Sequence, residues 1–389
     1  MDWTYLEVLM LGQYQFTENM MQLYRCIQDD LSRDIFWARL RYDIEEPLGN
    51  ENQMWMLDIL SGAYAKEDLE QMQNWESRFI GGQLKIILYG IGAFGLQTAI
   101  RILRNGGDFW GFCDKKAQDT MNLRVLDKPV FPPQYLLEHA NSCCVLITSV
   151  TYYDEIMGFL RHNQFPESHI IPGCFGKYAS IRKTVWGNQY FSFPELYKKG
   201  TAFVDAGCLD GGDSIRFAEW CGGEFSEILA FEPNFNAYLQ CNAKMEAANI
   251  GTFRLFNKGL GSITKTVSFS NSSNGSSHIA NFAQIKQSLE LLREEDDLSQ
   301  VEIIPLDTVT KDLTVGFIKM DIEGAELDAL CGAQETILRD KPFLAICAYH
   351  RQGDVIAIMD FLHKLVPEYR FWLRHYAPFA TETVLYAAL

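Results

Sequence analysis

The sequence predicts an α/β protein with two Rossmann-like units in series after a helical N-terminal segment. Two observations predict this fold class. Strand-like and helix-like patterns alternate from about residue 83 onward, and each half of that region opens with a strand that runs into a glycine-rich turn. We therefore expect a helical segment at 1–82, a small Rossmann-like domain at 83–172, a connector at 173–200 and a second α/β domain at 201–389.

Size and composition limit the classes of protein that the chain can belong to. Its 389 residues, of which 48% are hydrophobic, are enough for two or three domain cores. The net charge of −16 disfavours binding to nucleic acid. No apolar stretch is long enough to span a bilayer, and the N-terminus lacks the basic region of a signal peptide, so we expect a cytoplasmic protein. The 10 cysteines include no C-x-x-C pair, which argues against a zinc site and a disulfide framework.

The N-terminal segment is predicted to be helical because its apolar residues recur at helical spacing and no strand-like run interrupts them. These residues are Leu6, Leu9, Met10, Met20, Met21, Leu23, Tyr24, Ile27 and Leu31. Gly81-Gly82 then ends the segment.

In the first Rossmann-like unit, short apolar runs alternate with amphipathic stretches, which is the pattern of a small parallel sheet. The predicted strands are Lys85–Tyr89, Phe109–Cys113, Val145–Thr148 and His169–Ile171, and the predicted helices are Phe94–Arg104, Pro133–His139 and Tyr153–Arg161.

The turn after the first of these strands has the sequence G-x-G-x-x-G, formed by Gly90, Gly92 and Gly95, and Asp114 ends the next strand. Glycines allow a tight turn and a close approach of the backbone, a helix N-terminus holds phosphate, and the acid accepts hydrogen bonds from ribose hydroxyls. The pattern predicts a nucleotide site, with NAD as one ligand. No catalytic His or Lys constellation follows in this unit.

In the second α/β unit, strand-like runs again alternate with helical stretches, and the last two runs are spaced as an antiparallel hairpin. The predicted strands are Ala202–Asp205, Glu227–Phe231, Phe253–Phe256, Thr266–Phe269, Val315–Met320, Phe343–Ala348, Tyr369–Leu373 and Thr383–Ala387.

The second glycine-rich turn follows the strand that ends in Asp205, and Gly207 and Gly211 complete a D-x-G-x-x-x-G arrangement that also contains Asp210. The next strand ends in Glu232-Pro233. This arrangement predicts a site for S-adenosylmethionine. The glycines let the backbone pass beneath the methionine and adenosine parts, and the acid accepts hydrogen bonds from both ribose hydroxyls.

A third acidic strand end is Asp321, in the run Ile318–Glu326 between a strand and an amphipathic helix. In an open α/β sheet, the carboxyl ends of the strands are where ligands bind. Glu323 and Glu326 are predicted in the first helical turn, where the macrodipole favours negative charge. Asp321 and Glu323 are also candidate oxygen ligands for a divalent cation.

The C-terminal half, from about Phe191 to Leu389, resembles the FkbM-type methyltransferase family. The matching residues are Phe203-Val204-Asp205-Ala206-Gly207, Phe231-Glu232-Pro233, Asn257-Lys258-Gly259-Leu260-Gly261, Pro305-Leu306-Asp307, Ile318–Glu326, Ala348-Tyr349-His350 and Glu382-Thr383-Val384-Leu385-Tyr386. The resemblance implies a class I methyltransferase sheet with an antiparallel last strand. Leu209 departs from the polar residue that many relatives carry. The runs Leu88–Gly92 and Phe112–Asp114 resemble the Rossmann-like domains that precede sugar-modifying transferases.

The expected function is that of an S-adenosylmethionine-dependent O-methyltransferase acting on a hydroxyl of a sugar, a glycan or a nucleotide-linked sugar. Asp321 and His350 each end a strand at the ligand-binding edge and are the candidate bases for the hydroxyl proton. Lys319, His375 and Glu382 are further candidates for the pocket. Two alternatives stay open: an NAD-dependent oxidoreductase that uses the Gly90 turn, and a non-catalytic nucleotide- or cofactor-binding module of a glycan-assembly pathway. The sequence leaves the oligomeric state undetermined.

Overall fold

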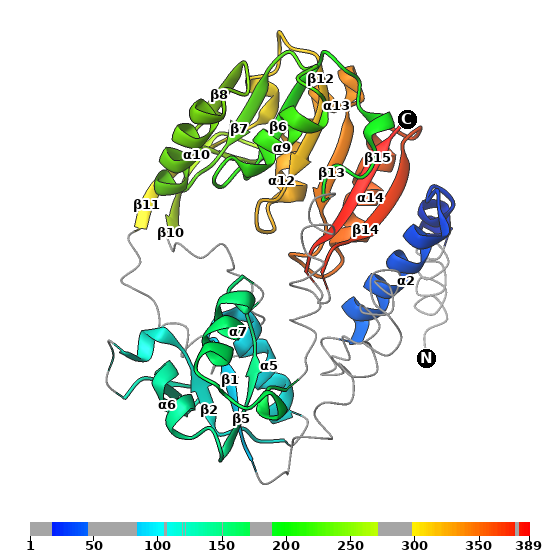
Figure 1. Cartoon of the computed structure of the whole chain (residues 1–389). Coiled ribbons are helices and arrows are strands. Elements are labelled where there is room, and N and C mark those ends of the chain that lie inside the picture. Colours follow the sequence, from blue (N-terminus) through cyan, green and yellow to red (C-terminus); the bar gives the residue numbers. More distant parts are fainter. Residues whose placement is uncertain are drawn as a thin grey trace, which may run out of the picture. The chain divides into compact units, whose positions relative to one another are not determined.

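The structure is a computed structural model that describes residues 18–45, 84–104, 107–118, 120, 122–149, 151–171, 189–270, 298–377 and 381–389. The chain divides into two compact units, one of Met1–Gln53, Asn188–Ser273 and Asp296–Leu389 and one of Met54–Gly187 and Asn274–Glu295. Both units combine helices with mostly parallel sheets, so the predicted α/β fold class is confirmed (Figure 1). No helix in the described part of the chain is long and apolar enough to cross a membrane.

The larger unit is built on a seven-stranded sheet with the order β14-β15-β13-β12-β6-β7-β8. Strand β15 runs antiparallel to both of its neighbours, and the other pairs are parallel. The antiparallel hairpin expected at the end of the chain is therefore present. The strands are β6 Ala202–Ala206, β7 Ile228–Phe231, β8 Phe253–Phe256, β12 Val315–Met320, β13 Phe343–Cys347, β14 Arg370–His375 and β15 Thr383–Ala388.

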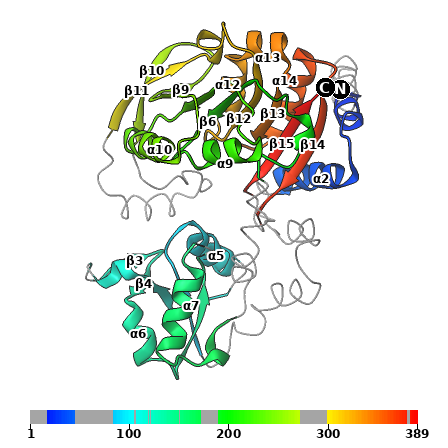
Figure 2. The same ribbon diagram turned by 45° about the horizontal axis from the view of Figure 1, so that its top comes forward.

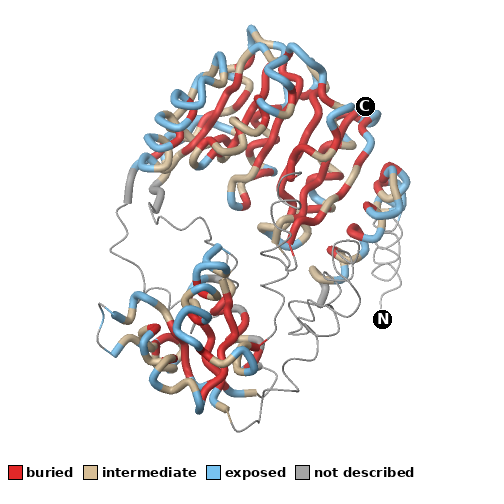
Figure 3. Tube along the Cα trace, viewed as in Figure 1, coloured by how far each residue is buried: buried red, intermediate tan, exposed pale blue. Residues whose placement is uncertain are grey.

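The centre of this sheet is buried on both faces. Every residue of β6, β7, β12 and β13 is buried, which explains why these strands appear in the sequence as mostly apolar runs, interrupted only by Asp205 and Lys319 (Figure 3). Helices α9 and α10 cover one face, and α13 and α14 cover the other (Figure 1, Figure 2). The helices are α9 Gly212–Trp220, α10 Phe235–Ala248, α12 Glu326–Cys331, α13 Gln334–Asp340 and α14 Asp354–Leu365.

A second, three-stranded sheet of the larger unit was only partly predicted. It has the order β10-β11-β9 and consists of β9 Gly259–Leu260, β10 Lys265–Ser270 and β11 Leu298–Ile304. Sequence patterns indicated only β10. The two residues of β9 are too few for a periodic signal, and β11 begins directly after the acidic run 294–297.

The N-terminal residues belong to the larger unit. Helix α2 spans Asp30–Glu45, residues 18–25 are also helical, and residues 1–17 and 46–82 of the predicted segment lie outside the described residues. Phe371 N of β14 donates to Cys26 O, and Gln28 N donates to Phe371 O, both at 3.0 Å. The backbone between the two helices therefore pairs with the outer edge of the large sheet, and α2 lies along that edge (Figure 1).

The smaller unit contains a five-stranded sheet with the order β3-β4-β2-β1-β5. Its elements are β1 Lys85–Tyr89, α5 Ala93–Arg104, β2 Gly111–Cys113, β3 Arg124–Val125, β4 Lys128–Phe131, α6 Pro133–Glu138, β5 Cys143–Ile147 and α7 Tyr153–His162. The prediction missed β3 and β4, which are short, and β4 includes Pro129. The strand predicted at His169–Ile171 is wrong: Glu167–His169 is a 3₁₀ turn, and only Ile170 forms an isolated bridge to Val145.

Candidate functional site

The carboxyl ends of β6, β7, β12 and β13 lie on one edge of the large sheet because these strands are parallel neighbours. Asp205 lies in β6, Glu232 follows β7, Asp321 follows β12 and His350 follows β13. Four candidates that are far apart in the sequence are thereby brought to a single edge, which is where open α/β sheets bind their ligands.

Two glycines of the loop after β6 combine a left-handed backbone with close neighbours, so a larger residue would be strained at either position. Gly207 has φ +76°, and a Cβ atom there would lie 1.9 Å from the carbonyl oxygen of Asp321. Gly211 has φ +78°, and its Cβ would lie 2.9 Å from Cγ of Met245. The loop therefore packs directly against the backbone after β12 and against α10, and side chains at these two positions would hold it away.

Asp205 supports this loop from inside the protein. The residue has no exposed surface. Its carboxylate lies 3.0 Å from Nζ of Lys319 and accepts a hydrogen bond from Ser214 Oγ at 2.7 Å. Both oxygens of Asp205 face protein groups, so this residue does not present a free carboxylate to a ligand. The sequence had placed it among the residues that contact the cofactor directly.

Lys319, on β12, joins the same buried group. Its Nζ donates to the carbonyl oxygen of Gly207 at 2.8 Å and lies 3.2 Å from Asp213. Burial opposes the charge on this lysine, but Asp205 and Asp213 outweigh that effect and raise its pKa well above the ordinary value. The lysine therefore stays charged and connects β12 to the glycine loop.

Glu232 lies beside the glycine loop and is 6% exposed. Its Oε2 accepts a hydrogen bond from Leu209 N at 2.9 Å, and its Oε1 accepts one from Asn234 N at 2.8 Å. Burial raises the pKa of Glu232. An ionised carboxylate offers about four acceptor positions, so these two backbone donors leave capacity for the hydroxyls of a ligand. Pro233 follows at the end of the strand.

The outer tip of the glycine loop is exposed. Asp210 pairs with Lys244 of α10 at 2.7 Å and also accepts a hydrogen bond from Gly212 N at 3.0 Å. Leu209, which departs from the family pattern, is 58% exposed and adopts φ +47°. An exposed leucine in a left-handed conformation at the tip presents an apolar surface beside Glu232.

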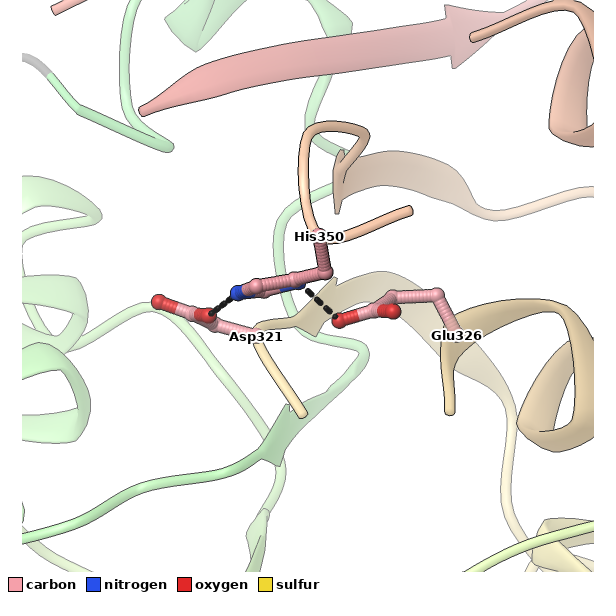
Figure 4. Close-up of side chains that lie close together, drawn as sticks. All are labelled: Asp321, Glu326 and His350. Atoms are coloured by element: carbon pink, nitrogen blue, oxygen red, sulfur yellow. Dashed lines mark ion pairs between the residues drawn. The ribbon is translucent and has the colours of Figure 1, made fainter. Parts of the chain in front are cut away.

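Asp321 and His350 meet on the other half of the edge (Figure 4). Asp321 Oδ1 lies 3.5 Å from His350 Nε2, and Asp321 Oδ2 accepts a hydrogen bond from the Tyr190 hydroxyl at 2.8 Å. Tyr190 belongs to the predicted connector, and its sequence context carried no signal for this role. The two residues that we selected as candidate bases are therefore brought together, and a buried tyrosine supports one of them.

Glu326 also belongs to the group around Asp321 and His350. The sequence predicted it only as an acid in the first turn of a helix. It is 1% exposed, lies 2.9 Å from His350 Nδ1, and accepts a hydrogen bond from Ile322 N at 2.9 Å. Burial disfavours the imidazolium, but Glu326, Asp321 and Glu323 outweigh it and raise the pKa of His350 to about 9. His350 is therefore charged at neutral pH, so it does not accept a proton as the base we had considered.

The predicted place of Glu323 in the helix is wrong. Helix α12 begins at Glu326, and Glu323 lies before it with φ +55°, followed by Gly324 with φ +92°. Two successive left-handed residues cannot continue a right-handed helix. The Glu323 carboxylate lies 3.7 Å from His350 Nε2 instead.

Asp321, Glu326 and His350 are also a candidate metal group, because one ligand atom from each lies within 4.8 Å of the others. The sequence had suggested Asp321 with Glu323. The structure adds His350 to this pair. Its Nε2 faces the carboxylates of Asp321 and Glu323, and its Nδ1 faces Glu326.

In the smaller unit, the Gly90–Gly95 turn and Asp114 lie together. A Cβ atom on Gly95 would lie 2.0 Å from the carbonyl oxygen of Gly90, so this glycine allows α5 to pack closely on β1. Asp114 accepts hydrogen bonds from Ile91 N at 3.2 Å and Lys116 N at 3.0 Å. The acid supports the turn, and Gly92 has open space around its Cβ position.

Comparison with protein families identifies the larger unit. The model of the methyltransferase FkbM domain matches residues 205–376. Residues 205–376 are therefore similar to the FkbM methyltransferase family. The chain is accordingly an enzyme with methyltransferase activity. The FkbM domain begins within β6 and ends after β14, so Tyr190 and Glu382 lie outside it.

Among solved structures, the chain is similar to the methyltransferase FkbM from Methylobacillus flagellatus KT, at 18% identity and a TM-score of 0.46, over 86% of this chain and 100% of that one. A putative rRNA methylase from Clostridium thermocellum shares 14% identity over 52% of this chain and 93% of its own, with a TM-score of 0.32. A putative methyltransferase from Streptococcus mutans, solved with SAH, shares 14% identity over 53% of this chain and 97% of its own, with a TM-score of 0.29. The search of curated proteins found no match to this chain.

Proposed function

We propose that the protein is an S-adenosylmethionine-dependent O-methyltransferase that acts on a hydroxyl of a sugar, a glycan or a nucleotide-linked sugar. One observation supports this most. The glycine loop with Glu232 and the Asp321–His350 group occupy neighbouring strand ends of an FkbM methyltransferase domain, which provides a cofactor half and an acceptor half on a single edge.

In the cofactor half, Glu232 accepts the ribose hydroxyls, and Gly207 and Gly211 let the loop backbone lie beneath the cofactor. Pro233 and Asp210 border this half, and Asp205 acts through Lys319 by holding the loop from inside. Leu209 provides apolar contact at the tip.

In the acceptor half, Asp321 binds the acceptor hydroxyl, and His350 holds the Asp321 carboxylate in place. The oxygen attacks the methyl carbon in line with the sulfonium. The new O–CH₃ bond forms as the S–CH₃ bond breaks, the sulfur keeps the electron pair, and S-adenosylhomocysteine leaves. The hydroxyl proton passes to a carboxylate of the site. Orientation and exclusion of water supply most of the acceleration in such a displacement.

Calorimetric titration with S-adenosylmethionine tests the cofactor half. We expect Glu232→Gln to weaken binding at least about tenfold, because a hydrogen bond to a charged group contributes about 1.5–3 kcal/mol. Glu224→Gln is the matched control, since Glu224 is exposed and pairs with Lys199. Absence of binding to the unaltered protein, or equal binding by Glu232→Gln, would refute the cofactor assignment.

Incubation with radiolabelled S-adenosylmethionine and a panel of sugars and sugar nucleotides tests the reaction. A labelled, base-stable ether product supports O-methyl transfer. Cofactor binding without transfer to any of these acceptors would instead favour a non-catalytic module. A change of NADH fluorescence on titration that is lost in Gly92→Val would favour the oxidoreductase alternative.

A divalent cation is a second candidate component, favoured by the close approach of Asp321, Glu326 and His350. Such a cation would supply Lewis acidity to the acceptor oxygen. It competes with the Nε2 proton of His350, so binding strengthens as pH rises. Titration with manganese at two pH values measures this. Unchanged turnover after treatment with a chelator would exclude the requirement.

A further inference from the structure

A chain of hydrogen bonds connects Asp321 to a second carboxylate, Glu382, which directly precedes β15. The Tyr190 hydroxyl donates to Asp321 Oδ2 at 2.8 Å. Gln189 Nε2 donates to that same hydroxyl at 3.1 Å and to Glu382 Oε2 at 2.7 Å. Two adjacent residues therefore hold the two carboxylates, and both residues lie before the first residue of the FkbM domain.

The backbone at this junction is strained. Tyr190 has φ +69° and Glu382 has φ +68°, a left-handed conformation that residues other than glycine rarely adopt. Among the described residues of the larger unit, the other non-glycine residues with positive φ are Leu209, Glu323, Asn249 and Lys341. Asn249 and Lys341 are helix C-caps, where this conformation is common, whereas Leu209 and Glu323 belong to the two halves of the site.

The surroundings of Glu382 favour its neutral form. Burial, together with the charges of Asp321 and Glu323, raises the pKa of Glu382 to about 7, although Gln189 and His350 oppose the shift. Tyr190, Cys347 on β13 and Tyr349 after it also have pKa values raised by burial and by the nearby carboxylates. A carboxyl group near its midpoint at neutral pH is well suited to take up and release a proton.

The carboxylates of Asp321 and Glu382 differ in how many of their oxygens already have protein partners. Asp321 accepts a hydrogen bond on Oδ2 and faces the charged His350 with Oδ1. Glu382 accepts a hydrogen bond only on Oε2, and within the described residues no donor pairs with its Oε1. The stabilised carboxylate is suited to holding the acceptor hydroxyl, and the less occupied one is suited to accepting its proton.

We propose that Glu382 is a further catalytic residue of the acceptor half and that Gln189 is its positioning residue. This inference builds on the proposed methyl transfer. As the acceptor oxygen bonds to the methyl carbon, its O–H bond breaks and the proton moves to Glu382 Oε1. The O–H electron pair stays on the oxygen, and the S–CH₃ pair goes to the sulfur. The protonated Glu382 then releases the proton to water.

Infrared difference spectroscopy on the full chain tests the protonation of Glu382 without an acceptor. We expect a protonated-carboxyl band that disappears with a midpoint near pH 7 in the unaltered protein and is absent in Glu382→Gln. In Gln189→Met the band should persist to higher pH, because the lost hydrogen bond had favoured the ionised form. A spectrum that Glu382→Gln leaves unchanged would overturn the proposal.

Turnover with an acceptor found by the labelled-cofactor panel tests the catalytic role. We expect Glu382→Gln to lower kcat by about 10²–10⁴-fold with unchanged affinity for S-adenosylmethionine. We expect Gln189→Met to shift the acid limb of the pH–rate profile upward, which a purely structural role would not do. Full turnover by Glu382→Gln, or an unmoved acid limb in Gln189→Met, would refute the assignment.

The infrared titration tests the role of Glu382 independently of the proposed methyltransferase function. Failure of the unaltered protein to bind S-adenosylmethionine would refute the proposed function, whereas the carboxyl band would still report on Glu382. Binding of the cofactor without the titrating band would overturn the role of Glu382 and leave the methyltransferase proposal intact.

Discussion

At the scale of single residues, Gly207 shows how closely the glycine loop after β6 packs against the backbone after β12. We expect Gly207→Ala to lower the free energy of unfolding by about 2–5 kcal/mol, from a left-handed conformation that costs about 1–2 kcal/mol and from overpacking of about 1–3 kcal/mol. Gly222→Ala is the control, because Gly222 has φ +67° but no atom lies within 4 Å of its Cβ position. Urea unfolding measures both, and equal losses would contradict the close packing at Gly207.

The buried lysine of β12 leads to a second prediction at this scale. Lys319→Met leaves Asp205 buried without its cation, so we expect a loss of about 3–5 kcal/mol in the free energy of unfolding. Lys199→Met removes an exposed partner of Glu224 and should not change stability measurably. Denaturant titration compares the two variants, and a stable Lys319→Met protein would show that the ion pair is dispensable.

Glu382 makes stability depend on pH. Its pKa is raised from 4.5 to about 7, so the folded state holds this proton more tightly than the unfolded chain does. The contribution to stability is present in full below pH 4.5 and is lost as pH rises through about 7. We therefore expect Glu382→Gln to melt at a higher temperature than the unaltered protein at pH 8 but not at pH 4.5. Equal melting differences at the two pH values would contradict the raised pKa.

At the scale of elements, the N-terminal helices protect the outer edge of the large sheet. Ser32 of α2 is fully buried, and its Oγ accepts hydrogen bonds from Leu373 N and Arg374 Nη1, both at 2.9 Å. Arg374 also pairs with Asp29 at 2.8 Å. An edge strand with unpaired backbone groups invites association with other chains, and these contacts satisfy part of β14.

Replacing Ser32 tests this cover. We expect Ser32→Ala to cost about 1–3 kcal/mol, because the amide of Leu373 would be left buried without its acceptor. Ser226→Ala, at an exposed position, is the comparison. Thermal unfolding monitored by circular dichroism measures both variants, and no difference between them would mean that water replaces the Ser32 hydroxyl.

The same helix reaches the loop that carries His350. Asp43 Oδ2, near the C-terminus of α2, accepts a hydrogen bond from Gly353 N at 2.9 Å. Gly353 lies at the N-cap of α14, a few residues after His350. The N-terminal residues therefore support the loop that carries His350, although they lie far from it in the sequence.

At the scale of the whole molecule, the two units should respond separately to the cofactor. All residues of the proposed cofactor half lie in the larger unit. In calorimetry we expect two unfolding transitions, of which only one is stabilised by S-adenosylmethionine, by about 2.7 kcal/mol at a concentration one hundred times Kd. Gly207→Ala assigns that transition, because it lowers the stability of the larger unit. Stabilisation of both transitions would show that the smaller unit also responds.

The sequence was sufficient for the parts of the fold that have strong local signals. Mostly apolar runs predicted β6, β7, β12 and β13, and the glycine turns with their acidic strand ends predicted which loops face the ligand edge. These signals are local because a buried parallel strand must be apolar along its length, and a tight turn needs glycine.

Other features depend on contacts between distant segments and could not be read from the chain. Tyr190 and Gln189 hold Asp321 and Glu382 only because Tyr190 contacts β13 and β15. Glu326 reaches His350 only because β12 and β13 are neighbours. Asp205 was predicted to bind the cofactor from its place at a strand end, and only the structure shows that it is buried beside Lys319.

The sequence by itself determined the α/β class, the FkbM resemblance and the positions of the glycine loop and Asp321 at strand ends. The tertiary structure decided the surroundings that raise the pKa of His350, the burial of Asp205 beside Lys319 and the connection from Asp321 to Glu382. The physical reason is that strand and turn formation depend on a few consecutive residues. The charge of a side chain depends instead on burial and on carboxylates that other elements bring to it.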